Sequence, residues 1–155
     1  MNDYKGLYNR FGKAYKDEAI RVQTQMLIDY APLALFKAYI GKSFQNDTLN
    51  LRDSYGWAVY YNGIEKKHGY LTDSKEAQTN SYFHGESIDG RKEVSDFILQ
   101  YTPIIERGWE LMLVAAAPYS VCLEGEGFYV LSAAFDEVTK DFMGKGKIDF
   151  ILHTY

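Results

Sequence analysis

Three histidines and one cysteine are the side chains of this chain best suited to metal binding or nucleophilic attack. His68, His84 and His153 lie far apart, and no two have the spacing that places two imidazoles on one metal ion. Cys122 stands in an apolar stretch, and a catalytic thiol needs a positioned histidine, which the sequence does not nominate. We therefore expect surface histidines, a reduced and buried thiol, and neither a metal nor a cofactor.

A second candidate site combines carboxylates with glycines. Glu124 and Glu126 lie in the run LEGEGF, and a glycine-rich loop of this kind can bind an anion through its backbone N–H groups. Two carboxylates would repel a phosphate, however, and neither the glycine spacing nor a following Lys-Ser/Thr pair matches a P-loop. A turn that needs glycine for its backbone conformation explains the run better.

A third candidate site is an Arg-Asp pair followed by an aromatic run that could stack bases or sugars. Arg52 and Asp53 are adjacent, and such pairs are more often structural or solvated than catalytic. Alternation along a strand would divide the aromatic side chains between two sheet faces. They are Tyr55, Trp57, Tyr60 and Tyr61. Since no acid, base and nucleophile form a set, we expect a protein that is not an enzyme.

Length and composition indicate one globular domain over residues 1–155. The hydrophobic fraction of 46% and the charged fraction of 25% are ordinary for a folded domain. The net charge of -4, without a long Lys/Arg cluster, disfavours tight or sequence-specific nucleic-acid binding. The 14 tyrosines suit contact surfaces. Without an apolar signal region or a run of about 20 apolar residues, we expect a cytoplasmic protein with no membrane partner.

Hydrophobic periodicity predicts three helices, near 13–41, 91–102 and 128–143. Pro32 interrupts the first of them and predicts a kink or the start of a second short helix. The middle helix places Val94, Phe97, Ile98 and Tyr101 on one face. We expect an α+β fold in which all three helices cover one face of a small, mostly antiparallel sheet.

The sheet is predicted from a hairpin near 55–71, a central strand near 109–117 and a possible edge strand over 147–154. Asn62-Gly63 is the dipeptide best suited to the tight hairpin turn. The polar run before the hairpin, 43–50, has the composition of a turn. Residues 72–90 are too long and polar for an ordinary connection, so they are predicted to form an excursion or mobile loop.

Two motifs, taken in their order along the chain, resemble a known family: the small head-tail joining or tail-completion (neck) proteins of long-tailed bacteriophages and prophages. The family's Asp-Thr-Gly-x-Leu-Arg-x-Ser is similar to a run whose matching residues here are Asp47, Thr48, Leu51, Arg52 and Ser54. The family's second motif, a Tyr followed by a Glu and a Gly, is similar to a run with Tyr119, Glu124 and Gly125. Leu49 replaces the family's Gly and Ser120 its Ala, which suggests a different turn.

The resemblance implies structural work in virion assembly. Subunits would form a homo-oligomeric ring between the portal or connector protein and the tail, either by themselves or only on the partner, and would locate to the virion neck or tail. The resemblance implies no cofactor and no catalytic residue. It assigns the matched residues a structural or assembly role, and edge strands or the 72–90 loop would mediate subunit contacts.

Two other function classes remain open from the sequence. One is a small enzyme or ligand-binding domain with a pocket near Glu124 and Trp57, in which a histidine within hydrogen-bond reach of Glu124 would be the deciding feature. The other is an adaptor that binds a partner protein through the aromatic strand and the long loop.

Overall fold

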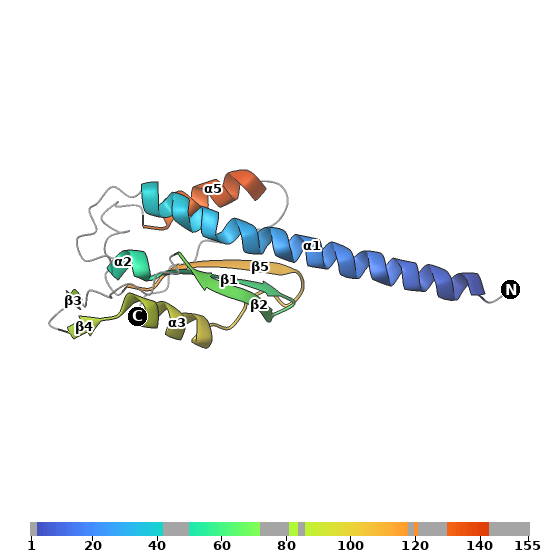
Figure 1. Ribbon diagram of the computed structural model, residues 1–155, viewed down its shortest axis with the longest axis horizontal. Coiled ribbons are helices and arrows are strands. Elements are labelled where there is room, and N and C mark those ends of the chain that lie inside the picture. Colours follow the sequence, from blue (N-terminus) through green and yellow to red (C-terminus); the bar gives the residue numbers. More distant parts are fainter. Residues whose placement is uncertain are drawn as a thin grey trace.

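A three-stranded sheet forms the centre of the computed structural model (Figure 1). Its strands are β1 (Tyr55–Tyr61), β2 (Ile64–Tyr70) and β5 (Trp109–Ala115), and they pair antiparallel in the order β2-β1-β5. The structure describes residues 3–41, 50–71, 81–83, 86–117, 120 and 130–142. The predicted α+β class with a small antiparallel sheet is confirmed.

The turn between β1 and β2 has the backbone conformation that its sequence predicts. Asn62 has a φ of 53° and Gly63 a φ of 74°, the pair of positive angles that a type I′ turn needs and that Asn-Gly adopts most easily. The turn is tied to the chain just before β5, because the Asn62 N–H donates to the Gly108 carbonyl and the Gly108 N–H donates to Asn62 Oδ1, both at 2.8 Å. The hairpin over 55–71 is confirmed.

The first helix, α1 (Asp3–Gly41), is a single helix of 39 residues with Pro32 inside it. It begins ten residues before the predicted start near 13. Of the two outcomes expected at Pro32, a separate second helix is excluded. Proline removes one backbone hydrogen bond from a helix interior, and the neighbouring Ala31 and Leu35, both 0% exposed, fix this part of α1 on the sheet.

Helices cover both faces of the sheet, so the expectation that all of them share one face is wrong. Residues of β1 alternate between two buried clusters: Trp57 and Val59 pack with Leu35 of α1, whereas Ala58 packs with Val94 of α3 (Gly90–Gln100). The physical reason is visible in β1, whose residues 55–60 are all buried. A strand that is buried on both faces needs a cover on each.

The remaining helices lie at two other places. α5 (Ser132–Phe142) packs on α1 rather than on the sheet (Figure 1), with the Tyr30 and Phe142 rings edge to face at 5.2 Å. α2 (Asn50–Asp53) is a single turn before β1. The middle helix, α3, starts at an N-cap in which the Asp89 carboxylate accepts from two backbone N–H groups at 3.1 Å.

Within the described residues β5 pairs only with β1, and its predicted central position stays a prediction because the strand predicted over 147–154 lies outside them. Its residues alternate: Glu110, Met112 and Val114 are buried, whereas the residues between them are half-buried. The near-continuous apolar run therefore belongs to a strand that is buried on one face and half-buried on the other. β2 forms the other edge and is largely exposed, with Glu65, Lys66 and Lys67 in its middle, a charge pattern that resists further strand pairing.

Two strands, β3 (Ser81–Phe83) and β4 (Glu86–Ile88), form a separate small antiparallel sheet inside the predicted excursion over 72–90. Asp89 and Gly90 of that segment form the start of α3. Residues 72–80 and 84–85 lie outside the described residues, and so does the strand predicted over 147–154.

Candidate functional site

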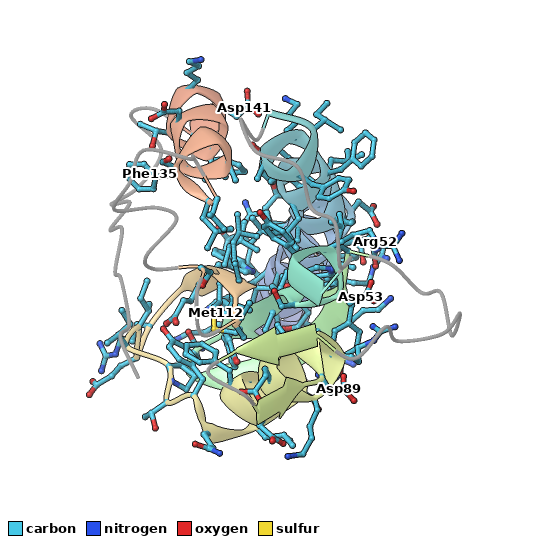
Figure 2. All side chains as sticks on the ribbon, turned by 90° about the vertical axis from the view of Figure 1, so that its left-hand side faces the viewer. Arg52, Asp53, Asp89, Met112, Phe135 and Asp141 are labelled. Atoms are coloured by element: carbon cyan, nitrogen blue, oxygen red, sulfur yellow. The ribbon has the colours of Figure 1, made fainter. Side chains whose placement is uncertain are left out.

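Arg52 and Ser54, two residues of the first family-like motif, lie in the turn that leads into β1. Arg52 and Asp53 are held in a 3.1 Å ion pair, with 26% and 14% of their side chains exposed (Figure 2, which faces this end of the molecule). Ser54 follows, fully buried, and its carbonyl accepts a 3.0 Å hydrogen bond from the Ala116 N–H. This pair and this serine act in the structure as a local anchor for the start of the central strand.

The second half of the motif begins beside the first. β1 and β5 pair with Tyr55 opposite Ala115, so the start of β1 and the end of β5 meet at one end of the sheet. Ser120 continues from there: it is buried, and its hydroxyl donates to the Ala115 carbonyl at 2.7 Å. A small side chain fits this place, and the buried hydroxyl has a hydrogen-bond partner.

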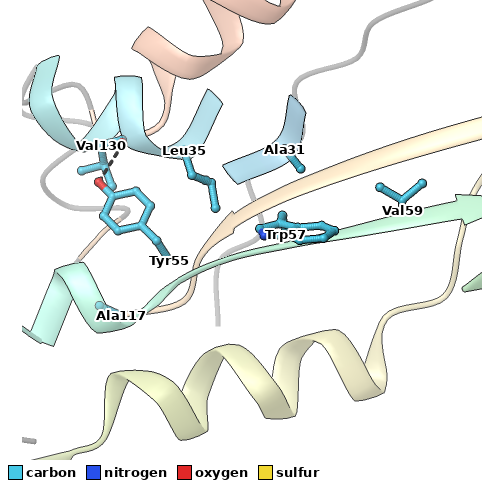
Figure 3. Close-up of a cluster of buried hydrophobic side chains, with 7 residues drawn as sticks. All are labelled: Ala31, Leu35, Tyr55, Trp57, Val59, Ala117 and Val130. Atoms are coloured by element: carbon cyan, nitrogen blue, oxygen red, sulfur yellow. Dashed lines mark hydrogen bonds between the residues drawn. The ribbon is translucent and has the colours of Figure 1, made fainter. Parts of the chain in front are cut away.

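A third segment joins this end of the sheet through Tyr55. The Tyr55 hydroxyl donates to the Val130 carbonyl at 2.8 Å, and both residues are buried (Figure 3). Val130 directly precedes α5, so one tyrosine links the start of β1 to the start of the last described helix. We call this meeting of residues 54–55, 115–117, 120 and 130 the motif junction.

Several predicted site residues fall outside what the structure describes. Of the motif residues, these are Asp47, Thr48, Tyr119, Glu124 and Gly125, together with the substituted Leu49. Leu51 lies in α2, but its side chain is not among those described. The carboxylate Glu126, the thiol of Cys122 and the imidazoles of His84 and His153 also lie outside.

The other chemical candidates lie apart from one another. His68 is on the exposed strand β2, 2.7 Å from Glu65, with 41% of its side chain exposed. Trp57 is 5% exposed and packs between α1 and Gly69. The aromatic run is divided between the two faces of the sheet as predicted. Among the described residues no three His, Cys, Asp or Glu side chains come together as metal ligands.

Sequence reasoning missed one buried carboxylate. Glu110 in β5 is 7% exposed, and it accepts hydrogen bonds from the Tyr101 hydroxyl at 2.5 Å and from the backbone N–H groups of Ile104 and Ile105 at 3.0 and 2.9 Å. These three donors satisfy the carboxylate and hold the loop between α3 and β5 against the sheet. The only signal in the sequence was an acidic residue inside an apolar strand.

Two tyrosines near Glu110 have pKa values that its charge helps to raise. Burial, and then the hydrogen bond to Glu110, raise the pKa of Tyr101 well above the ordinary tyrosine value. Burial, and then the charges of Glu65 and Glu110, raise the pKa of Tyr60 to about 12. The Tyr60 hydroxyl is buried and has no hydrogen-bond partner among the described residues. Both phenols therefore stay neutral at physiological pH, and this cluster stabilises the fold without offering a base or a nucleophile.

The largest unexplained feature is the outer face of α1. Every residue from Tyr4 to Glu18 is exposed, and this half of α1 extends beyond the sheet (Figure 1). Large apolar side chains continue along the helix on its solvent side, where soluble proteins rarely leave such a series uncovered. Together with their exposed fractions they are Tyr4 82%, Tyr8 80%, Phe11 68%, Tyr15 81%, Val22 42%, Met26 61%, Leu33 60%, Phe36 52% and Ile40 62%. We call this set the exposed stripe.

No family model, curated protein or solved structure matches the chain. Among the described helices none is long and apolar enough to cross a membrane.

Proposed function

We propose that the protein is a structural subunit of a phage or prophage virion, a head-tail joining or tail-completion protein that forms a ring between the portal or connector and the tail. The observation that carries the proposal is the motif junction. Ser54, at the end of the first motif, and Ser120, near the start of the second, are 66 residues apart in the chain. Both are hydrogen-bonded to the end of β5, Ser54 through Ala116 and Ser120 through Ala115. A paired motif of structural residues is what an assembly protein needs to hold its loops in place.

The character of the described surface supports an assembly role over catalysis. The buried polar groups at the motif junction and around Glu110 are hydrogen-bonded to backbone groups. These hydrogen bonds hold loops in place. The apolar exposure is concentrated on α1, where a partner can be recognised. Acidic net charge also suits a protein beside a DNA conduit, because it does not grip the passing phosphates.

The test is to inactivate the coding sequence in the phage or prophage that carries it. Lysates should then contain DNA-filled heads and complete tails that are not joined, and supplying the wild-type chain in trans should restore joined virions, both scored by electron microscopy. A matched complementation with Ser54→Leu, which places a large side chain in the fully buried motif junction, should fail to restore joining. Joined, infectious particles without the protein would overturn the proposal.

A further inference from the structure

We infer that the exposed stripe of α1 is a self-association surface on which two copies of this chain pair antiparallel about Val22. This inference goes beyond the proposed function and does not depend on it, because a two-fold contact between copies closes on itself, whereas a ring needs a contact that continues.

The stripe lies directly opposite the face that α1 packs on the sheet. Ala31 is nine residues from both Val22 and Ile40, and Leu35 is nine residues from Met26. At 3.6 residues per turn, nine residues are two and a half turns, so each exposed side chain points away from its buried counterpart. Ala31 and Leu35 are 0% exposed while Met26 and Ile40 are 61% and 62% exposed. The helix is thus apolar on two opposite sides, and the fold uses only one of them.

The spacing of the stripe is the same when it is read from either end. Its positions, including two acidic ones, are 4, 8, 11, 15, 18, 22, 26, 29, 33, 36 and 40. From either end of the stripe, the spacing between successive positions alternates between four and three residues until it reaches Val22, so Val22 is the centre of the pattern. Two copies that run antiparallel therefore place Tyr4 against Ile40 of the second copy, Tyr8 against Phe36, and Phe11 against Leu33. The average step of 3.6 keeps the stripe on one side of a straight helix, so the pairing needs no supercoil.

A hollow at the midpoint gives the pairing its centre. It is a shallow depression, open to solvent, of about 350 Å³, and it is lined by Tyr15, Glu18, Ala19, Val22, Gln23 and Met26. The small side chain of Ala19 leaves the space open, and the proposed two-fold axis at Val22 passes beside it. On an antiparallel partner the side chains of Val22 and Met26 arrive at this place, where an apolar knob fits an apolar hole.

The charge distribution distinguishes antiparallel from parallel pairing. Residues 3–22 contain five Lys and Arg but three Asp and Glu, whereas residues 23–41 contain one of each. Parallel pairing would bring two positive halves together, and antiparallel pairing sets each positive half against a neutral one. The two acidic positions within the stripe have partners on the same helix: Glu18 pairs with Arg21 at 2.7 Å, and Asp29 accepts from Gln25 at 2.8 Å.

The available area is sufficient for a stable dimer. Aromatic side chains bury about 150–250 Å² each, so the exposed stripe offers roughly 1,000 Å² of apolar surface per chain. A standard interface buries about 800 Å² per partner. The stripe reaches that size without help from any other surface of the described residues.

The first measurement is the mass of the purified full chain by light scattering across a concentration series. A dimer is expected. Phe11→Glu should raise the dissociation constant about 100-fold or more, because each substitution acts twice in a two-fold contact. Asn9→Glu is the matched control: it adds the same charge on the same exposed turn, some 200° around the helix from Phe11, and should leave the dimer intact. Unchanged helix content in circular dichroism shows that both variants are folded.

The second measurement reports the direction of pairing, in chains that carry Cys122→Ser. Mild oxidation should cross-link Val22→Cys to itself and should cross-link a mixture of Phe11→Cys and Leu33→Cys chains, but should leave Phe11→Cys alone uncross-linked. Self-cross-linking of Phe11→Cys would mean parallel pairing and would overturn the proposal. A strict monomer at high concentration would overturn it too, as would a monomer whose stripe instead binds anionic lipid vesicles.

Discussion

Glu110 shows how one buried charge holds a connection that local sequence cannot specify. Its carboxylate accepts three hydrogen bonds, two of them from consecutive backbone N–H groups of the loop after α3. A backbone N–H that loses its acceptor inside a protein costs more than the hydrogen bond contributed. The residue therefore contributes to stability chiefly by leaving no donor of this loop unpaired.

Replacing Glu110 by glutamine is expected to lower the free energy of unfolding by about 2 kcal/mol, the size of a lost charge-assisted hydrogen bond. The amide keeps the shape but cannot accept on both of its polar atoms. Urea denaturation followed by tryptophan fluorescence measures the change. Glu106→Gln, at an exposed position of the same loop, should change stability by less than about 0.5 kcal/mol. Equal losses in both variants would contradict the role given to Glu110.

Tyr60 and Tyr101 are expected to respond in opposite directions when each is replaced by phenylalanine. Tyr60→Phe removes a buried hydroxyl that has no partner among the described residues and should raise stability by up to about 1 kcal/mol, while Tyr101→Phe removes the donor to Glu110 and should lower it by a similar amount. The same denaturation experiment measures both. A loss of stability in Tyr60→Phe would mean that its hydroxyl has a favourable partner.

Tyr60 also makes the stability of the fold depend on pH. The pKa of Tyr60 is raised from 10.0 to about 12, so above pH 10 the unfolded chain releases this proton first and binds fewer protons than the native state. Stability from this group is fully present below pH 10 and is lost as pH rises to about 12. Tyr60→Phe should flatten the fall in stability over this range, which denaturation at a series of pH values measures.

At the scale of elements, the closest packing in the sheet is between Trp57 of β1 and Gly69 of β2. A Cβ atom at Gly69 would lie 2.7 Å from the indole ring, far inside contact distance, and Trp57 is fixed beneath α1. Gly69→Ala is therefore expected to cost about 1–3 kcal/mol by overpacking. Thermal and urea denaturation measure the loss.

A second glycine provides the control for that prediction. Gly12 lies in α1, where a Cβ atom would meet nothing within 4 Å. Gly12→Ala should leave the sheet unaffected and raise the helix content slightly, since alanine favours helix over glycine by about 1 kcal/mol. If both substitutions destabilised the protein alike, the loss would stem from the alanine itself and not from contact with Trp57.

The elements that the sequence predicts well are those specified by neighbouring residues. Asn62-Gly63 selects the hairpin turn, and the spacing of Val94 and Ile98 marks α3, because each pattern depends on one local geometry. The distribution of helices over two faces is not local. A continuously apolar strand shows that both faces are covered, but nothing in β1 or β5 states which helix covers which face.

Some features of the candidate site could likewise be predicted from neighbouring residues, and others could not. The Arg52–Asp53 ion pair was predictable from the adjacency of the two residues. The early start of α1 was not, since Gly6 and Gly12 weaken the helical pattern and residues 4–18 are not held by the sheet. The hydrogen bonds of Glu110 could not be predicted from the sequence either. The path of the loop that donates them depends on Gly108, which has a φ of 113°, and on the hydrogen bond between Gly108 and Asn62.

For the molecule as a whole, the first 18 residues are expected to be dispensable for folding. All described side chains from Tyr4 to Glu18 are exposed, and the hydrogen bond from Trp109 to Thr24 at 3.1 Å is made further along α1. A chain lacking residues 1–18 should keep its cooperative unfolding transition with a stability within about 1 kcal/mol at concentrations where the full chain is monomeric. Chemical denaturation measures this.

The same deletion should remove self-association, because it takes away four of the aromatic side chains of the exposed stripe. Analytical ultracentrifugation of the shortened and full chains side by side separates the two effects. A shortened chain that fails to unfold cooperatively would show that this half of α1 contributes to the core after all.

A helix anchored at only one end also works as a lever. At 1.5 Å per residue, the stretch from Tyr4 to Glu18 extends about 21 Å beyond the part of α1 that is fixed on the sheet. A tilt of about 10° at the anchored end moves the tip by roughly 4 Å, a distance comparable to one turn of a helix. Small adjustments in the packing of α1 on the sheet are therefore magnified at the tip of the helix.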